Sequence, residues 1–124
     1  MRGSLLRIGV LVLAGALGVA CSSDDDDGTG PQSGVVEIQV SGTRFSPSLV
    51  EIRPGTTVRW VASEGGHTIT PDNPNQPGVW QAVNVTQAGV ALEHTFQQAG
   101  QTYEYHCVPH LQAGMTGTIR VVAE

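Results

Sequence analysis

Lysine is absent from this sequence: its positive charges are six arginines, set against 11 acidic residues, and the formal net charge is −5 at pH 7. Arg2 and Arg7 lie within the first 20 residues, so a chain that lost this segment would keep four arginines and all 11 acids, a charge of about −7. Nucleic-acid binding requires clustered Lys and Arg that displace counterions from phosphates. The charge balance therefore argues against nucleic acid as a partner.

Long hydrophobic runs are also lacking. The longest stretch of apolar residues and glycine, Ile8 to Ala20, has 13 residues, whereas a transmembrane helix needs roughly 20. A short apolar run after a basic start that contains Arg2 and Arg7 is typical of a secretory signal peptide. We therefore expect residues 1–20 to be a signal peptide and the chain to be exported.

The stretch "LGVAC", Leu17 to Cys21, resembles the lipobox of bacterial lipoproteins, in which the cysteine is lipidated and becomes the first residue of the mature protein. Ala20 is small as expected, but Gly18 stands where Leu is usual, and an ordinary cleaved signal peptide is the alternative. Residues 21–34 are acidic, rich in Gly and Ser and unable to build a core, which is typical of a tether. The resemblance implies membrane contact through a lipid on Cys21, on the periplasmic or cell-surface side of a bacterial membrane; without the lipid the protein would be secreted.

Cysteine is scarce, with only Cys21 and Cys107 in the chain. If Cys21 carries lipid, Cys107 is a single free thiol in an oxidising compartment. A disulfide framework is then excluded, because Cys107 has no partner. Metal ligation is a reason for an exported protein to keep such a thiol.

Helical periodicity is missing from residues 35–124, where Asn84 to Val90 is the one segment compatible with a short helical turn. Apolar and polar residues instead alternate with a period of two, which predicts half-buried strands. Gly- and Pro-rich turns separate these strands. At least six short strands without helices predict one antiparallel β-sandwich or barrel. The alternating runs are residues 36–40, 50–52, 58–60, 92–96, 103–105 and 119–121.

The connection between the last two predicted strands reads "CVPHLQAGM" and contains Cys107, His110 and Met115. A loop fixed at both ends by paired strands can gather ligands. Thiolate, imidazole and thioether together form a soft ligand set that suits copper. Magnesium and calcium prefer oxygen ligands, so the sequence predicts a copper site on this loop.

A fourth ligand has three candidates, His67, His94 and His106. Strand alternation places His106 on the face opposite to Cys107. His94 lies in the middle of a predicted strand, where a packed histidine is expected. His67 follows the turn "EGG" and begins a strand, so we expect it to be the second imidazole.

Four segments in this order resemble the cupredoxins, the blue-copper family of plastocyanin, pseudoazurin, amicyanin and halocyanin: "PGTTVRW" from Pro54, "GGHTIT" from Gly65, "QQAGQTYEYHC" from Gln97, and the C-x2-H-x4-M loop. The resemblance implies a Greek-key β-sandwich of the cupredoxin type with one type 1 copper per chain. It further implies that His67, Cys107 and His110 form the trigonal copper plane and that Met115 is the weak axial ligand.

Three positions depart from the family pattern. Gly66 stands where plastocyanins have Pro and resembles azurin, which implies an additional weak contact from the Gly66 carbonyl. Thr68 replaces the Asn that commonly ties the two ligand loops together, so this hydrogen bond is not predicted. His106 replaces the aromatic residue of plastocyanin's remote electron route, which is therefore not carried over.

The loop offers neither a substrate pocket nor a catalytic base, so we expect an electron carrier and not an enzyme. Small or apolar residues surround His110, which predicts a patch for brief docking of redox proteins such as cytochromes or membrane oxidoreductases. The alternatives are a copper storage or delivery protein, and an accessory domain that feeds a copper enzyme. We expect a monomer.

Overall fold

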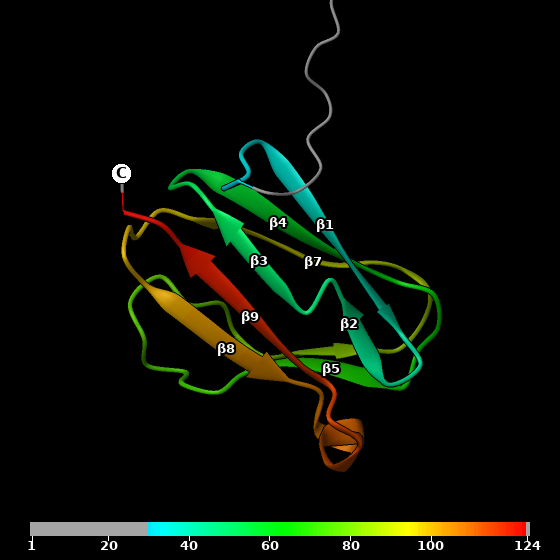
Figure 1. Cartoon of the computed structure of the whole chain (residues 1–124). Coiled ribbons are helices and arrows are strands. Elements are labelled where there is room, and N and C mark those ends of the chain that lie inside the picture. The colour runs from blue at the N-terminus through cyan, green and yellow to red at the C-terminus, as the bar shows by residue number, and fades with distance from the viewer. Residues whose placement is uncertain (1–29, 124) are drawn as a thin grey trace, which may run out of the picture.

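The structure, a computed structural model, describes residues 30–123 (Figure 1). The predicted signal peptide, Cys21 and most of the predicted tether lie outside the described residues. Within residues 30–123, no helix has the length and apolar character needed to cross a membrane.

Two β-sheets pack against each other and form a sandwich, which confirms the predicted fold class (Figure 1). The first sheet has the order β2-β1-β4-β7 and the second the order β3-β9-β8-β5-β6. The strands are β1 (Val35–Ser41), β2 (Arg44–Ser46), β3 (Leu49–Ile52), β4 (Thr56–Ala62), β5 (His67–Pro71), β6 (Val83–Val85), β7 (Gly89–Phe96), β8 (Thr102–His106) and β9 (Thr116–Val121).

The core follows from the period-two pattern. Every second residue of β1 is buried, and β4 alternates in the same way between buried and half-buried residues. The centre of the sandwich is aromatic: Trp60, Phe96, Tyr103 and Tyr105 are all completely buried. Burial of apolar surface contributes about 25 cal/mol per Å², so these rings hold the two sheets together.

The strand pairing differs from the expected antiparallel arrangement at two places. β1 pairs with β4 in parallel, with Val36 opposite Val58, and β3 pairs with β9 in parallel, with Val50 opposite Ile119. Alternation predicts which face of a strand is buried, but it contains no information about the partner strand. The segment Asn84 to Val90, which is compatible with a short helical turn in sequence, forms no helix, because β6 and the start of β7 occupy it.

The chain between β8 and β9 forms a short 3₁₀ helix, η2 (Val108–Ala113). This helix lies at one end of the sandwich, at the bottom of Figure 1. The first described residues and the C-terminal end of β9 lie at the opposite end. The loop that carries the predicted metal ligands is therefore remote from the point where the described chain begins.

Candidate metal centre

Cys107 directly follows β8 and continues its buried face. The alternating pattern of β8 buries Tyr103 and Tyr105, and Cys107 is likewise completely buried as a free thiol. The backbone N–H of Thr68 donates a hydrogen bond to Cys107 Sγ at 3.4 Å. This contact holds the sulfur beside the start of β5.

His67 is the first residue of β5 and is only 4% exposed. The preceding residue, Gly66, has a φ of 87°, a conformation that glycine adopts without steric cost. The Gly66 N–H donates to the carbonyl of Val85 at 2.9 Å, which fixes the entry into the strand. As a result, His67 Nδ1 lies 3.8 Å from Cys107 Sγ.

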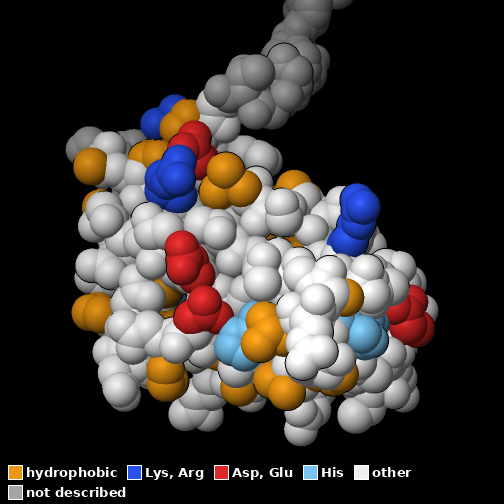
Figure 2. Space-filling view, turned by 60° about the horizontal axis from the view of Figure 1, so that its bottom comes forward, with side chains coloured by type: hydrophobic (Ala, Val, Ile, Leu, Met, Phe, Trp, Pro, Cys, Tyr) orange, Lys and Arg blue, Asp and Glu red, His pale blue; other side chains and the backbone are white. Residues whose placement is uncertain are grey.

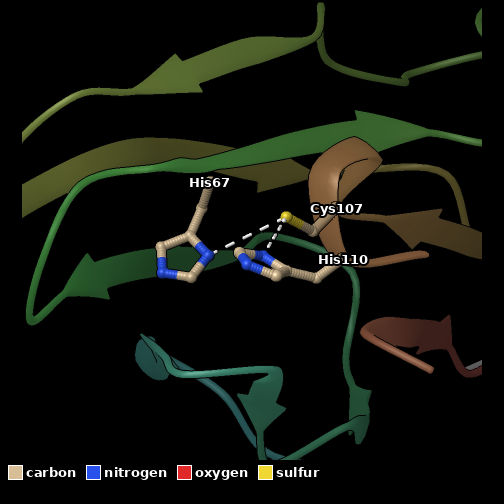
Figure 3. A group of neighbouring side chains, drawn as sticks. All are labelled: His67, Cys107 and His110. Atoms are coloured by element: carbon tan, nitrogen blue, oxygen red, sulfur yellow. Dashed lines mark hydrogen bonds between the residues drawn. The ribbon is translucent and has the colours of Figure 1, made fainter. Parts of the chain in front are cut away.

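His110 lies within η2, and its Nδ1 is 3.4 Å from Cys107 Sγ. Both imidazole rings therefore present the same nitrogen to the sulfur, as Figure 3 shows. The ring centroids of His67 and His110 are 5.1 Å apart. One ligand atom from each of these three residues lies within 4.8 Å of the others.

Met115 is completely buried at the start of the return to β9. Gly114, with a φ of 87°, ends η2 in the left-handed conformation. The Met115 N–H then donates to the His110 carbonyl at 3.3 Å, and the Met115 carbonyl accepts from the Cys107 N–H at 3.0 Å. The backbone of Met115 is thus bound to both neighbouring candidate ligands, and the loop is closed between them.

Thr68 joins the two segments that carry the candidate ligands. Its Oγ1 accepts a hydrogen bond from the Val108 N–H at 2.8 Å, and the Thr70 hydroxyl donates to the same oxygen at 2.9 Å. The sequence did not predict a tie between the loops here, because the Asn common in the family is absent. The threonine hydroxyl supplies an acceptor of its own at this position.

Glu64 was missed by the sequence analysis, although it lies in the "SEGG" turn three residues before His67. Its Oε2 is 2.8 Å from His67 Nε2 and accepts the Gly42 N–H at 2.7 Å, and its Oε1 accepts the Ser63 hydroxyl. The hydrogen bonds from Ser63, His67 and Gly42, in this order of effect, lower the pKa of Glu64 to about 2. A carboxylate in a turn before a candidate histidine ligand is the signal that could have revealed it.

The other two histidines lie elsewhere. His94 Nε2 donates to the Gly78 carbonyl at 2.7 Å, and its ring packs edge-on against Phe96 at 4.7 Å. His106 Nδ1 donates to Asp72 at 2.6 Å on the side of β8 away from Cys107. The structure therefore brings His67, and neither of these two, to Cys107 and His110.

The donor set fits copper. One thiol, two imidazole nitrogens and a nearby buried thioether are the soft ligands that copper prefers. The Glu64 carboxylate already contacts His67 Nε2, the ring nitrogen that points away from Cys107. Backbone hydrogen bonds fix Cys107, His110 and Met115. The site is thus assembled by the fold itself.

Comparison with known proteins also indicates a copper-binding protein. The family model for copper binding proteins of the plastocyanin/azurin family matches residues 33–122. Plastocyanin of Scenedesmus fuscus is 39% identical over 84 residues, 62% of this chain and 85% of that protein. Plastocyanin A/B of Petroselinum crispum is 32% identical over 87 residues, 64% of this chain and 89% of that protein. The pseudoazurin structure from Methylobacterium extorquens AM1 aligns with a TM-score of 0.56 and 25% identity over 73% of this chain and 76% of that chain. The chain belongs to the plastocyanin/azurin family of copper binding proteins.

Proposed function

We propose that this protein is an exported, lipid-anchored type 1 blue copper protein that carries single electrons between redox partners, with His67, Cys107, His110 and Met115 as the copper ligands. The observation that carries the proposal is the convergence of two Nδ1 atoms on the buried Cys107 sulfur, 3.8 and 3.4 Å away. Bound copper would supply a one-electron couple between Cu(II) and Cu(I).

A rigid scaffold supports this function, because electron transfer is fast when the ligands move little between oxidation states. The sandwich fixes Cys107 at the end of β8 and His67 at the start of β5. The Cys107–Met115 backbone hydrogen bond and the Thr68–Val108 hydrogen bond hold the loop between them. The chain's own residues thus preset the site and keep water from Cys107 and Met115, which are completely buried.

The surface around His110 supports docking of a redox partner. His110 is partly exposed, and its neighbours Val108 and Leu111 are 57% and 48% exposed. Figure 2 shows hydrophobic side chains gathered beside histidine side chains on this end of the molecule, with acidic side chains on both sides. An apolar patch around a ligand edge suits the small interfaces of brief redox encounters, with cytochromes or membrane oxidoreductases as partners of the monomer.

Optical absorption and electron paramagnetic resonance of the purified, copper-loaded and oxidised protein test the proposal. We expect an intense red-region absorption band with a narrow copper hyperfine splitting, and we expect the Cys107→Ser variant to lose both, because the thiolate is the charge-transfer donor. A pale protein with ordinary hyperfine splitting, or a variant that stays blue, would refute the type 1 assignment. Such a result would favour copper storage or delivery with the same residues.

The lipid anchor is proposed from the sequence around Cys21. The first described residues lie at the end of the sandwich opposite to η2, so a segment that leads to an anchor would join the sandwich away from the His110 surface (Figure 1). On expression in a bacterium, the protein should fractionate with membranes, and Cys21→Ser should release it. If the wild type and the Cys21→Ser variant were found in the soluble fraction in equal proportion, Cys21 would not be lipidated.

A further inference from the structure

We propose that Glu64 is a positioning residue that fixes the orientation and the tautomer of His67 and thereby tunes the metal centre. The inference rests on the proposed function for its effect on copper, but its effect on His67 does not depend on electron transfer. Three groups of the chain meet at this one carboxylate, and one of them is the far nitrogen of His67.

The contact with Glu64 supplies the hydrogen-bond partner that the buried His67 ring needs. The His67 side chain is 2% exposed, whereas the Glu64 side chain is 46% exposed. With so little exposure, the ring nitrogen Nε2 depends on a protein partner, and Glu64 Oε2 lies 2.8 Å from it. A buried donor that loses its partner is costly to the folded state, so the ring is held where Nε2 meets this carboxylate.

The chemistry of the carboxylate selects the tautomer. An ionised carboxylate only accepts hydrogen bonds, so the His67 proton lies on Nε2. In the neutral ring, Nδ1 then has a free lone pair, and Nδ1 is the atom that faces Cys107 Sγ. Glu64 thus presents the correct nitrogen of His67 to a metal before any metal binds.

Two further hydrogen bonds hold Glu64 itself. The Gly42 N–H, in the turn between β1 and β2, donates to Oε2 at 2.7 Å, and the hydroxyl of Ser63 donates to Oε1. Gly42 belongs to the turn of the first sheet, and His67 begins a strand of the second. The carboxylate therefore links the β1–β2 turn to the segment that carries His67. Contacts with both sheets thus fix the position of His67.

The expected consequence for copper has a definite sign. A carboxylate that accepts the far N–H of a ligand histidine raises the basicity of the ligating nitrogen, and a more basic ligand stabilises Cu(II) more than Cu(I). Wild-type Glu64 should therefore lower the reduction potential. Loss of such a partner typically weakens metal binding 10- to 100-fold.

The first experiment uses the metal-free protein and imidazole nitrogen NMR at mildly alkaline pH. In the wild type we expect neutral His67 to carry its proton on Nε2, and in Glu64→Ala we expect a mixture of both tautomers. Glu51→Gln is the matched charge control, because Glu51 pairs with Arg120 near the end of β9, far along that strand from Met115. Unchanged His67 tautomers in Glu64→Ala, with native-like unfolding curves for all variants, would overturn the proposal.

The second experiment measures the reduction potential of copper-loaded Glu64→Gln and Glu51→Gln, which lose the same charge. We expect Glu64→Gln to lose tenfold more affinity for Cu(II) than for Cu(I), a rise of about 59 mV for one electron, and Glu51→Gln to change little. Equal shifts in the two variants would refute the tuning role. Because the NMR result needs no copper, a protein that failed as an electron carrier could still confirm that Glu64 positions His67.

Discussion

The Thr68 hydroxyl offers a sharp test of how the two ligand segments are held together, through the substitution Thr68→Val. Valine keeps the β-branched shape that suits a strand, and the Thr68 backbone N–H that donates to Cys107 Sγ stays in place. The substitution removes one acceptor oxygen and with it two hydrogen bonds, from the Val108 N–H at 2.8 Å and from the Thr70 hydroxyl at 2.9 Å.

The magnitude follows from the exposure of the groups that lose their partner. A typical hydrogen bond contributes about 1 kcal/mol net, and a buried orphan costs about 1–3 kcal/mol. Val108 is 57% exposed, so water can reach its N–H, and the lower figure applies. A loss of about 1 kcal/mol lowers the Tm of a domain of this size by about 4–8 °C and speeds local amide exchange about fivefold.

Thermal unfolding and hydrogen exchange of the metal-free protein measure both effects. We expect the Val108 amide to exchange faster in Thr68→Val, while amides in the middle of β4 keep their wild-type order of protection. Thr70→Val is the matched control, since it removes the hydroxyl contact at 2.9 Å and leaves the Thr68–Val108 bond intact. If the Val108 amide exchanged equally in wild type, Thr68→Val and Thr70→Val, the reasoning about this tie would be refuted.

Two further predictions concern the axial ligand and the buried tyrosines. Met115→Leu should give a protein that is still coloured but has a higher potential, because loss of a weak donor favours Cu(I), by about 59 mV for each tenfold change in relative affinity; an unchanged potential in voltammetry would show that Met115 is not axial. Burial raises the pKa of both tyrosines, Tyr103 and Tyr105, above the ordinary value of 10.0. The unfolded chain therefore loses protons above about pH 10 that the folded chain keeps, and stability that is fully present below this pH falls as the pH rises. Tyrosinate absorbance should then appear together with the loss of circular dichroism, and ionisation in a protein that stays folded would contradict this.

The parts of the fold that the sequence predicted are those with a local signal. Alternating residues revealed β1, β3, β4, β7, β8 and β9, because one face of each strand is more buried than the other. β2 and β6 have three residues each, too few for a period to be recognised. The parallel pairs β1–β4 and β3–β9 join distant segments, and their partners depend on how the whole sandwich packs.

The candidate site likewise contains residues that a local sequence signal predicts and residues whose role depends on the fold. Cys107, His110 and Met115 share one short segment, so their spacing was visible in the sequence. His67 was selected from its place at the start of a strand, and the structure brings it to Cys107. The roles of Thr68 and Glu64 depend on side-chain oxygens that reach Val108 and His67 across the fold, and no periodicity or spacing predicts such contacts.

The position of β9 has a consequence for the synthesis of the protein. This last strand lies inside the second sheet, between β3 and β8. While the ribosome is still making residues 116–121, no strand connects β3 to β8, and a non-local pairing such as β3–β9 forms slowly. The sheet that supports Cys107 and Met115 can close only after residues 116–121 have left the ribosome. A polypeptide that stops before β9 should therefore lack the closed sheet behind Cys107 and should fail to assemble the metal centre.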